Sequence, residues 1–230
     1  MKGGGYYMCG RFSLTVPIEE IIKLFVLANG DELDYVISYN IAPSQNVFSI
    51  ISDGEKNRGG YLQWGLVPSW ADNPSIGYKM INAQAETIDE KASFKNLLKR
   101  RRCIIVADGF YEWQKNQNGN KKPFRITRKD NSLLAFAGLW DRWEKEGTIL
   151  HTCTTITTKP NEIMKDIHDR MPVILPEEAQ KIWLDRTVQD SNYLKQLLTP
   201  YPAENMTAYE VSPLVNSPKN DQVECIQSLA

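Results

Sequence analysis

Apolar residues recur at spacings typical of helices in four segments of the chain. In the first segment, Ile18, Ile21 and Phe25 fall on one helical face, and Pro17 suits the first turn of a helix. In a later segment, Pro176 precedes an acidic first turn and an apolar face, which again indicates a helix start. Helices are therefore predicted over residues 17–29, 88–98, 176–184 and 190–198.

Shorter apolar runs predict strands over residues 47–51, 61–67, 103–107, 124–128, 133–139 and 149–157. The polar residues 129–132 between two of these runs indicate a hairpin turn. Strands and helices follow one another without a regular βαβ rhythm, an internal repeat or a linker. The predicted fold class is α+β, a single domain built around a mostly antiparallel, barrel-like β-sheet with peripheral helices.

Composition and charge exclude some classes of protein and limit others. The 230 residues are 42% hydrophobic and 24% charged, which is enough apolar material for a core. No apolar run approaches the roughly 20 residues that span a bilayer, and no signal peptide is present, so an intracellular protein is predicted. The net charge of −1 means that nucleic-acid binding would need a local basic patch. Residues 99–102, 121–122 and 125–129 are candidates, although such clusters are also typical of solvated helix ends and hairpin tips.

Cysteine and histidine usage predicts no metal site and no cofactor. Four cysteines and two histidines lack the spacing of a zinc site. Cys103, Cys153 and Cys225 lie in apolar runs and are expected to be buried reduced thiols. No glycine-rich phosphate loop, dinucleotide-binding fingerprint or nucleophile elbow is present.

Polar residues interrupt the apolar runs in six short motifs, which are Met8–Phe12, Tyr39–Pro43, Trp64–Trp70, Asn82–Thr87, Ala107–Trp113 and Ile167–Pro172. Together, and in this order, they resemble the SOS-response-associated peptidase family, also called the abasic-site processing family. The segment 211–216 also resembles the end of that family, so the resemblance covers nearly the whole chain. Each motif alone is weak, but the ordered set is highly specific.

The resemblance implies an enzyme that crosslinks itself to abasic sites in single-stranded DNA, shielding the lesion. Cys9, as the first residue of the mature chain, would form a Schiff base and then a thiazolidine ring with the sugar aldehyde. Asn82 would hold the opened sugar, Glu112 would lie beside the α-amine, and His168 would assist ring opening and the Schiff-base steps. The resemblance also allows strand cleavage by β-elimination and autoproteolysis. We expect a monomer in the bacterial cytoplasm, associated with the nucleoid when it acts on DNA.

The resemblance further implies DNA contacts outside these four residues. Arg11, Thr157 and Arg170 fall on positions that contact the DNA backbone. Trp64 and Trp70 are expected to stack on bases, although some tryptophans are expected in the core. The remaining expected DNA contacts are Asn40, Pro43 and Gln84.

Elementary chemistry explains why these residue types suit the reaction. Only a 1,2-aminothiol closes a five-membered ring with an aldehyde, and an internal cysteine has an amide instead of the amine. An α-amine has a pKa of about 7.7–8.0, so part of it is neutral near pH 7, unlike a lysine near 10.4. A carboxylate at Glu112 can accept a proton, and a histidine such as His168 can transfer one. Burying a glutamate in an apolar strand is costly without a partner, which also favours a functional Glu112.

Two departures from the family pattern affect these expectations. Gln84 stands where the family often has arginine, which predicts a smaller salt dependence of DNA affinity. Cys9 is preceded by eight residues, and Lys2-Gly3-Gly4 can be encoded by a bacterial ribosome-binding sequence. Residues 1–7 are therefore interpreted as a leader absent from the mature protein, with translation starting at Met8, and residues 8–230 as one domain. Autocatalytic cleavage before Cys9 is the competing hypothesis.

Two other function classes stay open. Cys9 and His168 could form the thiolate–imidazolium pair of a cysteine peptidase, which would need an oxyanion hole and a peptide cleft. The tryptophans and basic clusters could instead belong to a non-covalent single-stranded-DNA-binding module. Taken alone, His168 is also compatible with a core or helix-end histidine, and Asn82 with a turn residue.

Overall fold

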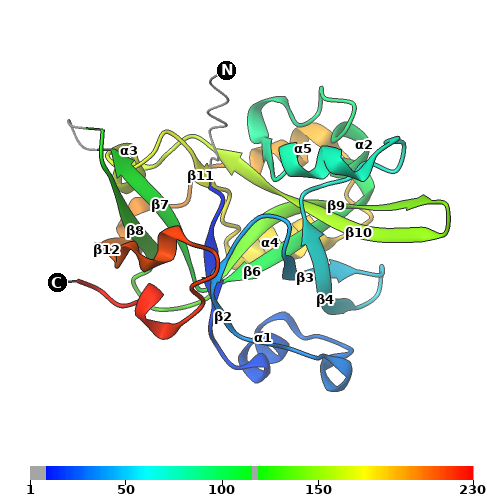
Figure 1. Ribbon diagram of the computed structural model, residues 1–230. Coiled ribbons are helices and arrows are strands. Elements are labelled where there is room, and N and C mark those ends of the chain that lie inside the picture. Colours follow the sequence, from blue (N-terminus) through cyan, green and yellow to red (C-terminus); the bar gives the residue numbers. More distant parts are fainter. Residues whose placement is uncertain (1–8, 116–118, 230) are drawn as a thin grey trace.

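A closed barrel forms the larger half of the molecule (Figure 1). The computed structural model describes residues 9–115 and 119–229. Five strands pair in a ring, which are β3 (Asn46–Ser52), β4 (Asn57–Trp64), β10 (Thr148–Thr158), β9 (Leu134–Lys145) and β6 (Arg102–Ala107). Two short strands, β5 (Asn82–Gln84) and β11 (Met171–Pro172), also pair with β10. Only the pairings of β10 with β4 and β5 are parallel among the described strands, so the predicted mostly antiparallel barrel is confirmed.

A second, antiparallel sheet packs beside the barrel and carries the start of the chain. Its order is β12 (Met206–Glu210), β8 (Lys121–Arg128), β7 (Gly109–Lys115), β1 (Phe12–Leu14) and β2 (Ser38–Ile41). Phe12 joins the two halves, because its ring lies 5.2 Å from that of Trp64 and 5.8 Å from that of Phe136. One continuous hydrophobic core therefore connects the barrel with the sheet that positions the N-terminal segment.

The helices are short and lie around the sheets (Figure 1). The α-helices are α1 (Ile18–Phe25), α2 (Lys95–Arg100), α3 (Glu162–Lys165), α4 (Glu177–Leu184) and α5 (Ser191–Gln196). Short 3₁₀-helices are η1 (Gly30–Glu32), η2 (Pro74–Lys79), η3 (Ala85–Thr87), η4 (Ala203–Asn205), η5 (Pro213–Asn216) and η6 (Val223–Cys225). Within the described residues, none of these helices has the length and apolar character needed to cross a membrane.

Several predicted elements are wrong in extent or in pairing. The helix predicted over 17–29 ends at Phe25, because Val26 is left-handed with φ 50°. The helix predicted over 88–98 consists mostly of turns, and α2 begins only at Lys95. The hairpin predicted around 129–132 does not form, since β8 and β9 belong to different sheets. A hairpin forms farther along the chain instead and joins β9 to β10. At its turn, Glu146 and Gly147 both have positive φ, as a tight hairpin turn requires.

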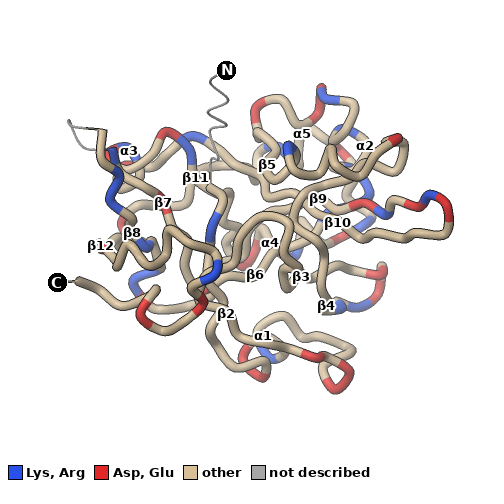
Figure 2. The backbone as a smooth tube through the Cα atoms, viewed as in Figure 1, with Lys and Arg blue, Asp and Glu red and all other residues tan. Residues whose placement is uncertain are grey.

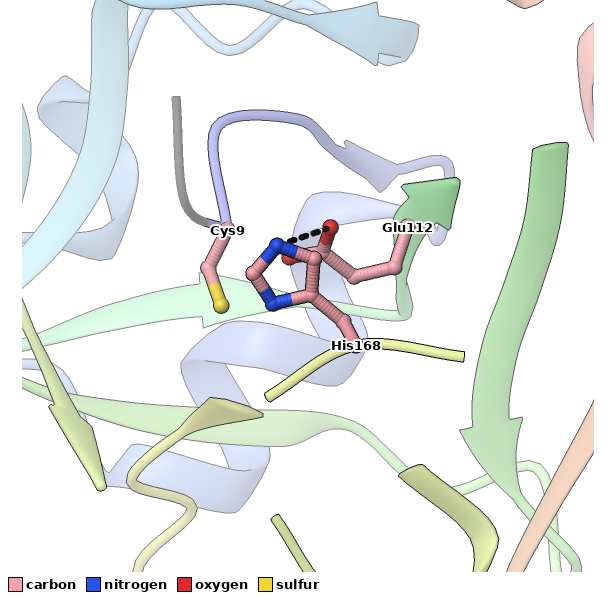
Figure 3. Close-up of side chains that lie close together, drawn as sticks. All are labelled: Cys9, Glu112 and His168. Atoms are coloured by element: carbon pink, nitrogen blue, oxygen red, sulfur yellow. Dashed lines mark ion pairs between the residues drawn. The ribbon is translucent and has the colours of Figure 1, made fainter. Parts of the chain in front are cut away.

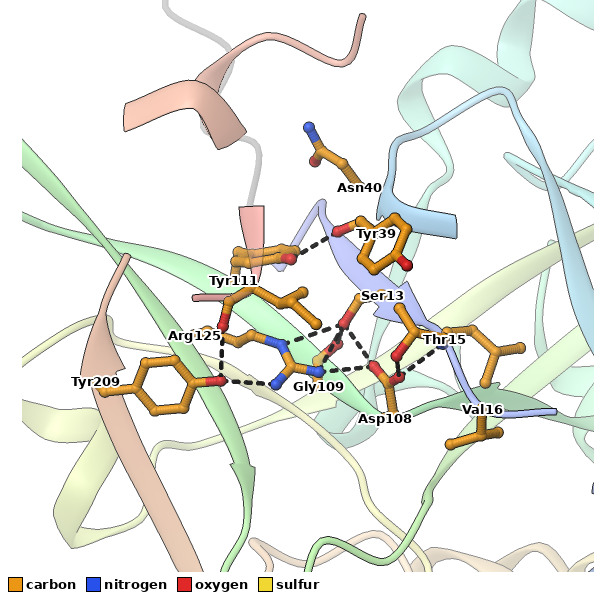
Figure 4. A network of polar contacts seen from close by, with 12 residues as sticks. Ser13, Thr15, Val16, Tyr39, Asn40, Asp108, Gly109, Tyr111, Arg125 and Tyr209 are labelled. Atoms are coloured by element: carbon orange, nitrogen blue, oxygen red, sulfur yellow. Dashed lines mark hydrogen bonds and ion pairs between the residues drawn. The ribbon is translucent and has the colours of Figure 1, made fainter. Parts of the chain in front are cut away.

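A buried polar network fixes β1 against β7 and β8 (Figure 4). The Arg125 guanidinium lies 2.8 Å from Asp108 Oδ1, and both side chains are almost fully buried. Asp108 also accepts hydrogen bonds from Ser13 Oγ and from the Thr15 backbone N–H, each at 2.6 Å. Tyr209 on β12 accepts a further hydrogen bond from Arg125. The network therefore holds the strand that follows Cys9 next to the strand that carries Glu112.

Candidate active site

The register of β1 and β7 places Cys9 beside Glu112. Phe12 is opposite Phe110, and the Tyr111 backbone N–H donates to the Arg11 carbonyl at 2.9 Å. If this antiparallel pairing is extended before β1 and along β7, Cys9 and Glu112 come next to each other.

His168 completes the group from the loop between α3 and β11. Its backbone N–H donates to the Met164 carbonyl at 2.7 Å, which continues the turn of α3. The Cys9 sulfur, a Glu112 carboxylate oxygen and a His168 ring nitrogen all lie within 4.8 Å of one another. Figure 3 shows the three side chains pointing toward one another, with His168 Nε2 4.0 Å from Glu112 Oε2.

Glu112 is a buried carboxylate poised to exchange protons. It is 2% exposed, and burial raises its pKa to about 6. The neighbouring His168 opposes this rise, as do hydrogen bonds donated by the Cys9 thiol and by the backbone N–H groups of Cys9 and Trp113. Among the described residues, Glu112 Oε1 has no hydrogen-bond partner. One oxygen of the carboxylate can therefore accept a hydrogen bond from an incoming group.

The Cys9 thiol is protonated in this environment. The side chain is 4% exposed, and burial is the main reason that its pKa lies well above the usual range. The negative charge of Glu112 raises the pKa further, whereas Arg170 lowers it. Cys9 also has a φ of 45°, a left-handed conformation that is uncommon for a residue other than glycine.

Both ring nitrogens of His168 have polar neighbours. Nδ1 accepts a hydrogen bond from the Arg170 backbone N–H at 3.1 Å and lies 3.0 Å from Asp169 Oδ1. Asp169 can accept a hydrogen bond from a protonated Nδ1, and the Arg170 N–H can donate to an unprotonated one, so these contacts fit either tautomer of the neutral ring, while Nε2 faces Glu112. The spacing of Cys9, Glu112 and His168 would admit a metal ion, and a carboxylate at Nδ1 is the kind of second partner that a metal-bound histidine usually has. The expected absence of a metal stays a prediction.

Arg170 is held next to this centre by an acidic residue that the sequence analysis did not assign. Its guanidinium donates two hydrogen bonds to Glu86, at 2.7 and 2.9 Å, and one to the Thr157 carbonyl at 2.7 Å. Thr157 is buried, so the DNA-backbone contact expected of its side chain is wrong. Glu86 belongs to a motif that the resemblance included, but only the structure reveals its partner.

Asn82 and Gln84 lie on one face of β5. Ala83 between them is buried in the core, so alternation along the strand directs the two polar side chains to the other face. Gln84 is paired in register with Thr157, which contacts Arg170. Asn82 is not among the described residues that line the cavity at Glu112. Its expected role in holding the opened sugar stays a prediction.

Trp64 is a core residue, so its expected stacking on DNA is wrong. It is 1% exposed, and its indole N–H donates to the Ile81 carbonyl at 2.9 Å. Trp70 is 61% exposed, and its expected stacking on a base stays a prediction.

Asn40 and Arg11 anchor the C-terminal segment. The buried Asn40 amide donates to the carbonyls of Ser217 and Asn220, at 3.0 and 2.7 Å, so its expected contact with DNA is wrong. Arg11 Nη1 donates to Asn40 Oδ1 and to the Val215 carbonyl, at 2.8 and 2.6 Å. Arg11 also lines the cavity, and its expected contact with the DNA backbone stays a prediction.

A cavity of about 880 Å³ opens at Glu112 and His168. Pro43, one of the expected DNA contacts, lines it, together with Tyr78 and several cations that the sequence analysis did not single out. Of the three predicted basic clusters, only Lys121 lies on this cavity. Arg102 and Arg125 are buried instead, where their guanidinium groups bind backbone carbonyls and Asp108, respectively.

Comparisons with known proteins agree with this arrangement. A family model described as "SOS response associated peptidase (SRAP)" matches residues 8–218. The abasic site processing protein YoqW of Bacillus subtilis is 55% identical over 223 residues, covering 96% of this chain and 100% of that protein. The abasic site processing protein HMCES of Xenopus tropicalis is 34% identical, covering 96% of this chain and 78% of that protein. A crystal structure of a protein from Bacteroides thetaiotaomicron has a TM-score of 0.84 at 26% identity, covering 96% of this chain and 100% of that chain.

Proposed function

Because the chain belongs to the SOS response associated peptidase family, we propose that it processes abasic sites in DNA through Cys9. The observation that carries the proposal is the meeting of Cys9, Glu112 and His168, of which Glu112 and His168 line the cavity. These are a nucleophile and two proton-transferring groups, which is what condensation with an aldehyde requires. The names of the relatives YoqW and HMCES support the same substrate.

The proposed reaction has two covalent steps at Cys9. The α-amine attacks the aldehyde carbon of the ring-opened sugar, and loss of water gives a Schiff base. The thiol sulfur then adds to the same carbon, and its proton moves to the nitrogen, which closes a thiazolidine ring. No oxidant or reductant is needed. The Schiff base is also the stage at which β-elimination would cut the strand, as a second activity of this site.

Glu112 and His168 would manage the protons of these steps. The backbone N–H of Cys9 donates a hydrogen bond to Glu112, so an α-amine in the place of this amide would lie where the carboxylate can take its proton. With a pKa of about 6, it is ionised near neutral pH yet basic enough to be protonated transiently. His168 Nε2, which faces Glu112, would transfer a proton to the sugar oxygen during ring opening.

The chemistry needs Cys9 as the first residue of the active protein. Residues 1–7, interpreted as a leader, lie outside the described residues. The family match begins at residue 8, which supports an active protein that starts near Met8. The φ of 45° at Cys9 supports it as well, because a left-handed conformation costs about 1–2 kcal/mol in a continuous chain and a terminal residue has no such torsion to strain.

The proposed substrate is single-stranded DNA, bound by a monomer. The cavity at Glu112 and His168 is also lined by Lys115, Lys121 and Lys165, which suits a polyanion. A cysteine peptidase is less well supported, because such an enzyme needs a thiolate, and burial together with Glu112 raises the pKa of the Cys9 thiol. Autocatalytic cleavage before Cys9 remains the competing route to a free terminal amine.

A denaturing gel tests the proposal. Protein translated from the Met8 codon is mixed with single-stranded DNA that contains one abasic site, and we expect a heat-stable adduct that Cys9→Ala abolishes. Cys225→Ala, which removes another buried thiol, is the matched control and should leave the adduct intact. Reversible binding without an adduct would overturn the proposal in favour of a binding module, and peptide cleavage without DNA would favour a peptidase. Sequencing the N-terminus of the native protein tests the start at Cys9, which a terminus at Met1 would refute.

A further inference from the structure

The side chains of Cys9, Glu112 and His168 form a donor set that suits a transition metal as well as an aldehyde. A sulfur, a carboxylate oxygen and a ring nitrogen all lie within 4.8 Å of one another, and within the described residues no other group of three potential ligands comes as close. Thiolate, imidazole and carboxylate ligands are typical of zinc, whereas magnesium and calcium prefer oxygen donors alone. The cavity at Glu112 and His168 gives an ion a path from solvent to this group.

The distances within the group need only a small adjustment to hold zinc. A tetrahedral zinc ion with bonds of about 2.0–2.3 Å separates its ligand atoms by about 3.3–3.6 Å. His168 Nε2 lies 4.0 Å from Glu112 Oε2, so closing on a metal needs a movement of about 0.5 Å between these two atoms. The three side chains already point toward one another (Figure 3), so their ligand atoms face a common centre.

Two features around the group point to a ligand rather than to a closed hydrogen-bond network. Glu112 is 2% exposed, and its Oε1 has no hydrogen-bond partner among the described residues. A buried carboxylate oxygen without a partner is costly, and a metal ion would satisfy it. Behind His168, Asp169 Oδ1 lies 3.0 Å from Nδ1, where a metal-bound histidine usually has a carboxylate. An ion on Nε2 would select the tautomer whose Nδ1–H donates to Asp169.

The charges around the group are compatible with a divalent cation. A zinc ion with one thiolate and one carboxylate ligand forms a unit without net charge. Arg170, the basic side chain that acts on the Cys9 thiol, donates two hydrogen bonds to Glu86, at 2.7 and 2.9 Å. Both signs of charge also occur along the segment from α3 to β11 that carries His168 (Figure 2). The positive charge of Arg170 is therefore largely balanced by Glu86 and opposes a metal ion only weakly.

We propose that Cys9, Glu112 and His168 bind zinc and related divalent cations of the first transition row reversibly, and that the bound ion inhibits the reaction with abasic sites. The inference rests on the proposed function for its fourth ligand, because the α-amine of a terminal Cys9 would take the place of the backbone N–H that donates to Glu112. The nitrogen and sulfur of one cysteine close a five-membered chelate ring on a metal. These are the two atoms that attack the aldehyde, so the ion and the lesion exclude each other.

Binding of the ion is a ligand exchange and needs no oxidant or reductant. Zinc replaces the proton of the Cys9 thiol, which is released to water together with any proton on the amine. The ion blocks both attacking atoms and acts as an inhibitor rather than as a cofactor. The expectation that the reaction itself uses no metal is therefore unchanged.

Titration with Co²⁺, a spectroscopic substitute for zinc, tests the site on protein translated from the Met8 codon. A thiolate ligand should give a sulfur-to-cobalt charge-transfer band in the near ultraviolet, and a tetrahedral site should give intense visible bands, all of which added Zn²⁺ removes. Cys9→Ser should abolish the charge-transfer band. Glu112→Gln and His168→Gln should each weaken cobalt binding by about tenfold or more, since each removes one ligand.

Matched variants outside the group serve as controls. Cys225→Ala removes another buried thiol, His151→Gln an exposed imidazole and Glu178→Gln an exposed carboxylate. Each should leave the cobalt affinity unchanged. Absence of the charge-transfer band in the wild-type protein, or equal effects of the site and control variants, would overturn the inference.

The denaturing gel then measures the effect of the ion on the reaction. Zn²⁺ at about ten times its Kd should slow adduct formation about tenfold, since only the ion-free fraction reacts. Excess EDTA should restore the full rate, and the same concentration of Mg²⁺ should have no effect. Cobalt binding with an unchanged rate in Zn²⁺ would refute the inhibition. If no adduct forms even after EDTA treatment, the proposed function fails while the cobalt spectra still decide the metal site, so the two failures are distinguishable.

Discussion

Replacing Glu112 with glutamine should stabilise the protein while impairing its chemistry. Glu112→Gln keeps the size and shape of the side chain but removes a negative charge from a site that is 2% exposed. The charge is costly there, because burial is the largest cause of the raised pKa and the opposing contacts of His168 and Cys9 only partly offset it. Groups held in an unfavourable state at functional sites often reduce stability in this way.

The magnitude follows from the shift of the Glu112 pKa from 4.5 to about 6. A shift of about 1.5 units corresponds to about 2 kcal/mol, at 1.36 kcal/mol per unit. Because the folded-state pKa is raised, folding favours the protonated carboxyl. The cost is therefore absent below the unfolded pKa of about 4.5, grows as the pH rises through about 6, and is complete above it. The neutral amide that Glu112→Gln introduces carries no such cost at any of these pH values.

Urea denaturation at two pH values measures this difference. At about pH 7.5, Glu112→Gln should raise the free energy of unfolding by up to about 2 kcal/mol, or the melting temperature by about 4–8 °C for a chain of this size. Near pH 4.5 the two proteins should have nearly equal stability. In the same preparation, adduct formation with abasic DNA should slow by about a hundredfold or more, as expected for loss of a general base. A variant that is destabilised at pH 7.5, or one that reacts at the wild-type rate, would refute the reasoning.

Three further substitutions test other contacts. Gln84→Arg should steepen the salt dependence of DNA affinity by about 0.7 in the log–log slope, and equal slopes for both proteins would argue against a phosphate near this position. Trp64→Ala should cost about 3–5 kcal/mol of stability in urea denaturation because the ring is in the core, and a near-neutral effect would contradict that placement. Asp108→Asn should destabilise the protein by about 3–5 kcal/mol in the same assay, because Arg125 would remain as a buried unpaired charge. Asp108→Asn/Arg125→Met should recover part of this loss, and no recovery would count against the ion pair as the cause.

Local sequence patterns predicted the barrel better than the second sheet. Strands β3 and β6 are largely apolar on both faces, and α4 begins after Pro176 as expected. In contrast, β1, β2, β7 and β12 are short or rich in polar residues, because they face the buried network at Asp108 or the active site. The predicted hairpin around 129–132 failed for a related reason. A turn signal shows that the chain changes direction, but it cannot show whether the next strand joins the same sheet.

At the candidate site too, the sequence motifs give the order of residues along the chain but not their positions in space. The ordered motifs identified Cys9, Glu112 and His168, which the fold brings together from three separate segments. They could not separate residues at the cavity from those that support it, so Trp64 and Asn40 were assigned to DNA although both are buried. Tyr78 lines the cavity but belongs to none of the six motifs.

The environment of Cys9 indicates the order of the proposed reaction. A thiol that attacked first would need to ionise, and both burial and Glu112 oppose that. An α-amine needs only to lose one proton from a pKa of about 7.7–8.0, and Glu112 accepts a hydrogen bond from the backbone N–H whose place that amine would take. Once a protonated Schiff base forms, its positive charge beside the sulfur opposes the effects of burial and of Glu112, which favours the thiolate. The feature that makes Cys9 a poor thiolate nucleophile in the free protein therefore directs the aldehyde to the amine first and leaves ring closure to the thiol.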